Sequence, residues 1–275
     1  MNRRLLSPNR VLMVSITVIM RMVILMVVIL TEAILTVDIH TVVIHMPMAE
    51  TTQSDLPLLR LMQLVSPSLP IGGFTYSQGM EWAVEDGILN DEQAVLRWML
   101  SLMEDNLLYV DLPVIHRLYN AFSAADAEQV NKWSDYLHAC RESRELREEE
   151  INRARALSRL LTDLEIPTVK QYNQALQTCH LAGFALASWH WQISIKQVLL
   201  GYSWSWIENQ VAAAIKLVPL GQTAGQKLQL MLTEAVPDLV EQALTLSDDD
   251  LGGSAPMLAI ASSRHETQYT RLFRS

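Results

Sequence analysis

The chain has 275 residues, half of them hydrophobic, so it is long enough for one large or two modest domains with a sizeable core. Its formal net charge is −9, and because the first 47 residues carry +2, residues 48–275 carry −11. This acidic balance argues against nucleic acid as a main partner. The two cysteines, Cys140 and Cys179, are too few for a disulfide framework and fit a reducing compartment.

Residues 1–47 form an apolar extension of low complexity. Residues 11–30, VLMVSITVIMRMVILMVVIL, have the length of a membrane span, and their thirteen Val, Ile and Leu residues outweigh the cost of about 3 kcal/mol for Arg21. We favour a start codon assigned too far upstream, with true initiation near Met46 or Met48, because a polar stretch and a well-patterned helix follow directly. A membrane anchor is the alternative interpretation.

Residues 66–82, SPSLPIGGFTYSQGMEW, follow a helix expected at 56–65 and look at first like a phosphate-binding loop. No strand precedes them and no lysine follows the glycines, so the interpretation fails. The prolines end the first helix, and Gly72 and Gly73 permit a reversal with positive φ. We expect a fixed corner between two helices, with Ser77 capping the second one and Glu81 in its first turn.

Helical patterns continue to the end of the chain. Asp91 and Asp126 are expected caps, Pro113 an expected break, and Glu148–Glu150 is interpreted as part of a solvated helix face. Residues 172–218 are apolar almost all round and rich in small residues, which indicates buried helices. We therefore expect residues 48–262 to form one all-α domain, a single-domain bundle of about nine or ten helices.

Motifs that carry chemistry are absent from the sequence. It has no G-x-S-x-G elbow and no metal-ligand spacing among its histidines and cysteines, so we expect no catalytic, cofactor or metal site. These side chains, and the tryptophans, are interpreted as core, surface or interface residues: His116, His138, Cys140, Cys179, His180, His190, Trp189, Trp191, Trp204 and Trp206.

Residues 263–275, SRHETQYTRLFRS, form a basic and aromatic C-terminal tail on an acidic protein. The tail contains three arginines and one glutamate. Its apolar residues Tyr269, Leu272 and Phe273 have no evident core to join. Arginine and aromatic side chains are typical of partner-binding surfaces. The alternative is a frayed terminus. We favour docking to a partner.

Two long stretches resemble the signatures of a known family. Residues 59–87, LRLMQLVSPSLPIGGFTYSQGMEWAVEDG, resemble the N-terminal signature of the urease accessory protein UreF family, and the C-terminal tail resembles its C-terminal signature. Intervening stretches fit in the family's order, so the resemblance covers residues 57–275 and leaves out residues 1–47. The chain has Ala154 where we expect a glycine in the family, which puts only the local packing in doubt.

The resemblance implies an all-α, dimeric, non-enzymatic chaperone of the cytoplasm. Such a protein binds UreD (also called UreH) and the GTPase UreG, and the complex delivers nickel to apo-urease. The implied partner surface contains Arg264, His265, Tyr269, Arg271 and Arg274. Candidates for the same surface or for the dimer contact are Tyr76, Ser77, Gln78 and Glu81. Candidates for contacts to UreG are Glu142 and Glu145. A stand-alone hydrolase and a membrane-tethered helical scaffold, which depends on residues 11–30 alone, are the competing hypotheses.

The mis-assigned start makes a direct prediction. N-terminal sequencing of the native protein should find the first residue near Met46 or Met48, because the patterned domain begins just beyond them. A terminus at residue 1 would contradict this interpretation.

Overall fold

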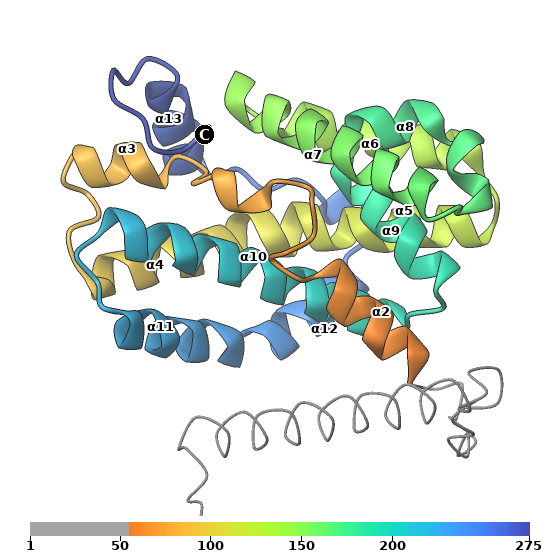
Figure 1. The fold of residues 1–275 in the computed structure, drawn as a ribbon, viewed down its shortest axis with the longest axis horizontal. Helices are drawn as coiled ribbons and strands as arrows, with labels where there is room; N and C mark the ends of the chain where they lie inside the picture. Colours follow the sequence, from red (N-terminus) through yellow and green to blue (C-terminus); the bar gives the residue numbers. More distant parts are fainter. Residues whose placement is uncertain (1–54) are drawn as a thin grey trace, which may run out of the picture. The chain divides into compact units, whose positions relative to one another are not determined.

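The computed structural model describes residues 55–275, which fall within one compact unit. The apolar run at 11–30 and the candidate starts Met46 and Met48 lie outside the described residues. The described part is entirely helical and contains no strand, so the predicted all-α class is confirmed (Figure 1). None of its helices combines the length and the apolar character needed to cross a membrane.

The helices follow one another through short connections. A nine-residue π-helical segment, Met103–Asp111, joins α4 to α5, and three 3-10 turns occupy Gly73–Thr75, Pro167–Lys170 and Asp248–Asp250. The α-helices are α2 (Leu56–Leu64), α3 (Met80–Glu85), α4 (Glu92–Leu102), α5 (Leu112–Ser123), α6 (Ala127–Cys140), α7 (Arg144–Asp163), α8 (Asn173–Thr178), α9 (His180–His190), α10 (Ile195–Leu217), α11 (Gln222–Glu234), α12 (Val236–Thr245) and α13 (Pro256–His265).

Helices α9 and α10 form the centre of the domain. Every residue of α9 from His180 to Ser188 is buried, and α10 packs against α2, α3, α4, α5, α11 and α12 (Figure 1). Glycines permit the close approach: a Cβ on Gly201 would lie 2.6 Å from a methyl of Leu61, and one on Gly183 would lie 2.9 Å from Leu157. The prediction that residues 172–218 form buried helices is confirmed.

The helix starts follow the sequence closely. Asp91 accepts the amide of Ala94 at 2.8 Å and Asp126 accepts that of Gln129 at 3.0 Å, so both predicted caps are confirmed. The predicted break at Pro113 is wrong: the π-helical segment Met103–Asp111 leads without interruption into α5, and Pro113 lies in the first turn of α5. Ser143, which the pattern did not single out, caps α7 by accepting the amide of Leu146 at 3.1 Å.

The predicted corner before α3 is present, but Ser77 does not serve as its N-cap. Gly79 is the N-cap residue, with φ +77°, and Gly72 takes φ +72° at the reversal. Ser77 is wholly buried, and its hydroxyl accepts the Glu81 amide at 3.4 Å while donating to the backbone oxygen of Ser275 at 2.6 Å. Ser77 thus joins the first turn of α3 to the other end of the chain.

Gly79 should tolerate no side chain. A Cβ there would lie 2.8 Å from the Ser262 nitrogen and 2.9 Å from the Ala261 Cβ, in addition to the strain of a positive φ. We expect Gly79→Ala to lower the free energy of unfolding by about 2–4 kcal/mol, measured by urea denaturation. The control is Gly87→Ala, which shares φ +77° but has nothing within 4 Å of the added Cβ, and should cost only about 1 kcal/mol. Equal losses in the two variants would contradict the close packing of α3 on α13.

Candidate functional site

The C-terminal tail folds back onto the corner before α3. The amides of Ser77 and Gln78 donate to the Ser275 oxygen at 2.5 and 3.1 Å, and the amide of Arg274 donates to the Thr75 oxygen at 2.9 Å. Helix α13 runs through residue 262, where we expected the domain to end and the tail to begin. The two signature stretches, whose contacting residues Ser77 and Ser275 are 198 positions apart, therefore form one structural unit.

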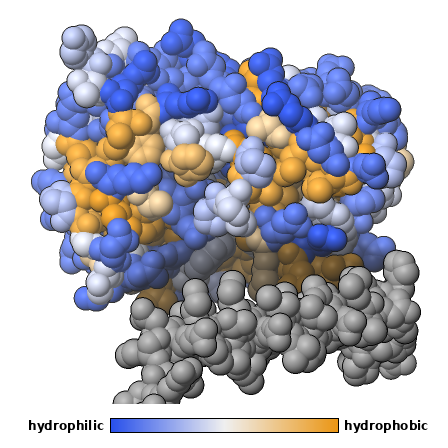
Figure 2. Space-filling view, viewed as in Figure 1, coloured by the Kyte–Doolittle hydropathy of each residue, from blue (hydrophilic) through white to orange (hydrophobic). Residues whose placement is uncertain are grey.

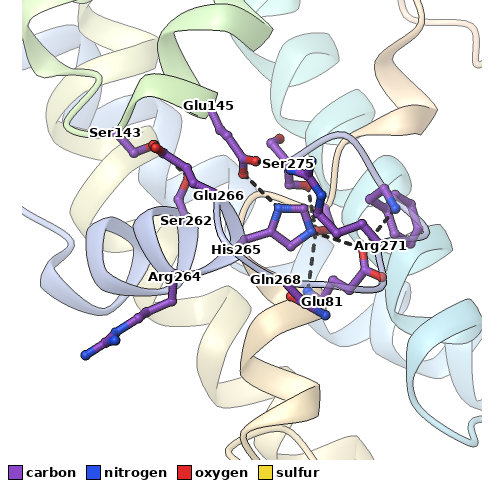
Figure 3. Close-up of polar contacts among 12 residues, drawn as sticks. Glu81, Ser143, Glu145, Ser262, Arg264, His265, Glu266, Gln268, Arg271 and Ser275 are labelled. Carbon is purple, nitrogen blue, oxygen red and sulfur yellow. Dashed lines mark hydrogen bonds and ion pairs between the residues drawn. The ribbon is translucent and has the colours of Figure 1, made fainter.

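The centre of this unit is a histidine between two carboxylates (Figure 3). His265 Nδ1 lies 2.8 Å from Glu145 Oε2 on α7, and His265 Nε2 lies 3.1 Å from Glu81 Oε2 on α3. All three side chains are buried. Three helices distant in sequence are thereby joined by one imidazole ring.

The two carboxylates also hold the tail itself. Glu81 accepts the amides of Leu272 and Phe273 at 2.6 and 2.8 Å, and Glu145 accepts a hydrogen bond from the Arg271 guanidinium at 2.8 Å. The Phe273 ring is buried, with the Lys216 ammonium 5.5 Å from its centre. The interpretation that Phe273 has no core to join is therefore wrong.

The predicted site residues gather around this unit but differ in exposure. Tyr76, Ser77, Glu81, Glu145 and His265 are buried, and Gln78 is half-buried. The exposed members are Glu142, Arg264, Tyr269, Arg271 and Arg274. The buried group holds the tail in place, and the exposed group is presented to solvent.

A second cluster of buried charge lies beneath Ser275. Glu149 accepts hydrogen bonds from Arg153 at 2.9 Å, Gln78 at 3.1 Å and the Ser275 hydroxyl at 3.3 Å. Burial raises the pKa of Glu149, against the opposing charge of Arg153. The interpretation of Glu148–Glu150 as a solvated face is correct only for Glu148, because Glu149 and Glu150 turn toward this cluster.

Arg141 joins the charge cluster to the helical core. Its guanidinium lies 2.9 Å from Asp111 and 3.2 Å from Glu150, and Glu150 in turn accepts the first amide of α9, that of His180, at 2.6 Å. Burial lowers the pKa of Arg141, but Asp111 and Glu150 outweigh it and hold that pKa well above its ordinary value. Burial raises the pKa of Asp111, which Arg141 opposes.

Two small cavities of about 20 Å³ each adjoin the Gln78–Glu149 contact. His180 lines one of them, and burial, then Arg153 and Arg141, hold its pKa well below the usual range, so the ring is neutral. Within residues 55–275 no group of three or more His, Cys, Asp or Glu side chains is placed to hold a metal ion.

Comparison with known proteins identifies the family of the chain. A family model described as UreF matches residues 89–233. The urease accessory protein UreF of Pseudomonas putida strain W619 is 51% identical over 222 residues, which is 81% of this chain and 99% of that protein. The chain belongs to the urease accessory protein UreF family.

Other UreF relatives match over a similar length. That of Alkalilimnicola ehrlichii is 46% identical over 228 residues, covering 83% of this chain and 100% of the relative. That of Escherichia coli O157:H7 is 46% identical over 217 residues, covering 79% and 97% respectively.

Sequence reasoning missed the charged residues that support the site. Glu149 and Glu150 were interpreted as solvated, and Arg141 and Asp111 were not singled out, because nothing in a single sequence reveals which charged residues of an amphipathic helix face inward. The sequence offers one indirect signal. The apolar stripe of residues 141–164 is narrow, and a helix that packs against several neighbours buries more positions than this stripe contains, so some of the charged positions must also face inward.

Arg141 should be the most sensitive position of the charge cluster. Arg141→Met keeps much of the side-chain volume but leaves Asp111 and Glu150 buried without their cation, so we expect a loss of about 3–5 kcal/mol in the free energy of unfolding. Arg144→Met, in an exposed ion pair near the start of α7, should change it by less than about 0.5 kcal/mol. Denaturant unfolding of both variants measures the difference, and similar values would contradict a structural role for the buried pair.

Proposed function

We propose that the chain carries out its role in urease maturation as a non-catalytic subunit that binds UreD (UreH) and recruits the GTPase UreG. The observation that supports this is the meeting of the two family signatures in one unit, where buried side chains hold the tail and exposed ones point outward. An enzyme would instead aim its polar groups into a site open to substrate.

The proposed partner surface consists of Arg264, Tyr269, Arg271, Leu272 and Arg274. Tyr269 is fully exposed and Leu272 is 67% exposed, although the backbone that carries Leu272 is fixed by Glu81. Because this backbone is held before a partner binds, docking costs less backbone entropy, and arginine and aromatic side chains are the ones that most often dominate binding energy. A cleft of about 470 Å³ beside Arg271, Phe273 and Arg274 adds a recess to this surface.

The remaining candidates take different parts in this proposal. Tyr76, Ser77, Gln78, Glu81, Glu145 and His265 act on partners through the position of the tail, because their side chains are largely buried. Glu142 is exposed and stays a candidate for a direct contact to UreG. Apolar patches among polar side chains on the face shown in Figure 2 are consistent with further protein contacts.

The wider assignments are part of the same proposal. We expect a homodimer that works in the cytoplasm, with nickel passing through the complex to apo-urease and no cofactor bound by the chain. The competing membrane-tethered scaffold depends on residues 11–30, outside the described residues. Fractionation of cells distinguishes the two, since a native protein found wholly in the membrane fraction would favour the scaffold.

Co-purification with UreD and UreG tests the partner surface. Deleting residues 263–275 should abolish recovery of UreD, but this also removes the buried side chains of His265 and Phe273. The sharper variant is Tyr269→Ala with Arg274→Ala, which removes only exposed side chains and should weaken binding about tenfold or more.

Arg159→Ala, on the exposed face of α7, is the matched control and should bind as the wild type does. Full recovery of UreD by the double variant would overturn the assignment of the surface. Its folding is checked by an unchanged thermal unfolding midpoint.

A further inference from the structure

Three side chains that line one small cavity carry buried polar atoms with no hydrogen-bond partner among residues 55–275. These atoms are both ring nitrogens of His180 on α9, the Nε of Arg153 on α7 and the Oε1 of Gln210 on α10. His180 and Gln210 are each only 2% exposed, so bulk water does not reach them freely. Folded proteins rarely leave a buried polar atom unpaired, and three such side chains at one cavity point to a bound ligand.

Other polar side chains that line this cavity already have partners. Gln78 donates to Glu149 at 3.1 Å and accepts from the Trp206 indole at 3.0 Å. The Tyr202 hydroxyl donates to Asp111 at 2.9 Å. The unpaired atoms are therefore a distinct set, supplied by α7, α9 and α10.

Charge and size define what this ligand is. Arg153 and Glu149 both line the cavity and form a 2.9 Å ion pair, so a cation would meet the guanidinium and an anion would meet the carboxylate. The cavity measures about 20 Å³, whereas a single water needs about 10–15 Å³ on the same measure. A neutral ligand of the size of one water molecule fits both limits.

The hydrogen-bonding chemistry fits water as well. The Nε of Arg153 only donates, and the Oε1 of Gln210 only accepts. The imidazole of His180 is neutral, because burial and the guanidinium groups of Arg153 and Arg141 hold its pKa well below the usual range, so each ring nitrogen either donates or accepts. A water molecule accepts from Arg153, donates to Gln210 and pairs with one nitrogen of His180, which gives the three hydrogen bonds typical of a buried water.

We infer that the cavity beneath the Gln78–Glu149 contact is a binding site for one internal water molecule, which joins Arg153 on α7, His180 on α9 and Gln210 on α10. This goes beyond the proposed partner binding and does not depend on it, because it concerns the interior of the free protein.

The water would extend the charge cluster into the helical core. Arg153 uses its Nη1 for Glu149, which in turn accepts the Ser275 hydroxyl at 3.3 Å. With the water on its Nε, the same guanidinium is also held from the side of α9 and α10. The site therefore adds a polar contact between three helices at a place where direct side-chain hydrogen bonds do not connect them.

Two measurements on the full wild-type chain test the site directly. A crystal structure should show one ordered water within about 2.7–3.2 Å of Arg153 Nε, Gln210 Oε1 and one nitrogen of His180. In solution, nuclear Overhauser spectra should show contacts between water and the ring protons of His180, with the sign given by a long-lived bound water.

The discriminating variant is the double substitution His180→Phe with Gln210→Met. Both replacements keep much of the side-chain shape, but they leave Arg153 as the one remaining partner, and a buried water needs at least about two. Magnetic relaxation dispersion of the solvent, which counts long-lived internal waters, should show the loss of about one water per chain. The matched control is Gln229→Met on α11, a buried glutamine that does not line this cavity, and it should retain the wild-type count.

The results that would overturn the site are equally specific. They are a wild-type His180 ring without contact to a long-lived water, an ion at the position of the water in the crystal structure, or an unchanged water count in the double variant. Cooperative thermal unfolding shows that the double variant is folded. If it is not, the wild-type crystal structure and spectra decide the inference.

Discussion

The carboxylate of Glu81 joins the two ends of the domain. It lies in the first turn of α3, it accepts two amides from the C-terminal tail, and it faces His265 on α13. Because the carboxylate is buried, each hydrogen bond that it failed to form would lower the free energy of unfolding by about 1–3 kcal/mol. The tail is therefore part of the fold, and the positive φ angles of Gly72 and Gly79 shape the corner that receives it.

The domain combines an apolar helical core with an unusual amount of paired buried charge. Glu149 with Arg153, and Arg141 with Asp111 and Glu150, lie between α7 and the central helices, and Glu150 also completes the start of α9. A hydrophobic core of similar volume would be at least as stable. The charge pairs instead fix how the helices are placed against one another, because a displaced helix would leave charges buried without partners. We interpret the charge layer as the device that fixes where the tail and its exposed side chains lie.

The sequence predicted local structure better than the placement of polar groups. The caps Asp91 and Asp126 and the buried helices of residues 172–218 follow from short-range pattern, and they are present. The predicted break at Pro113 is absent, because the helix continues through the π-helical segment into α5. Ser77 and Glu150 were misjudged because their partners, Ser275, Arg141 and the amide of His180, are distant in sequence or lie outside the same helix. The residues of the candidate site could be named from the family resemblance, but which of them are buried could not, since burial depends on how α3, α7 and α13 meet.

The long separation between the corner and the tail also bears on how the chain reaches its fold during synthesis. Ser77 and Gln78 are made early, yet the backbone oxygen they bind belongs to Ser275, and Glu81 waits for the amides of Leu272 and Phe273. Closing so long a loop is slow, and on the ribosome it must await the last residues of the domain. Until then the nascent helices carry open carboxylates and an uncovered apolar surface, a state in which protection from aggregation matters most.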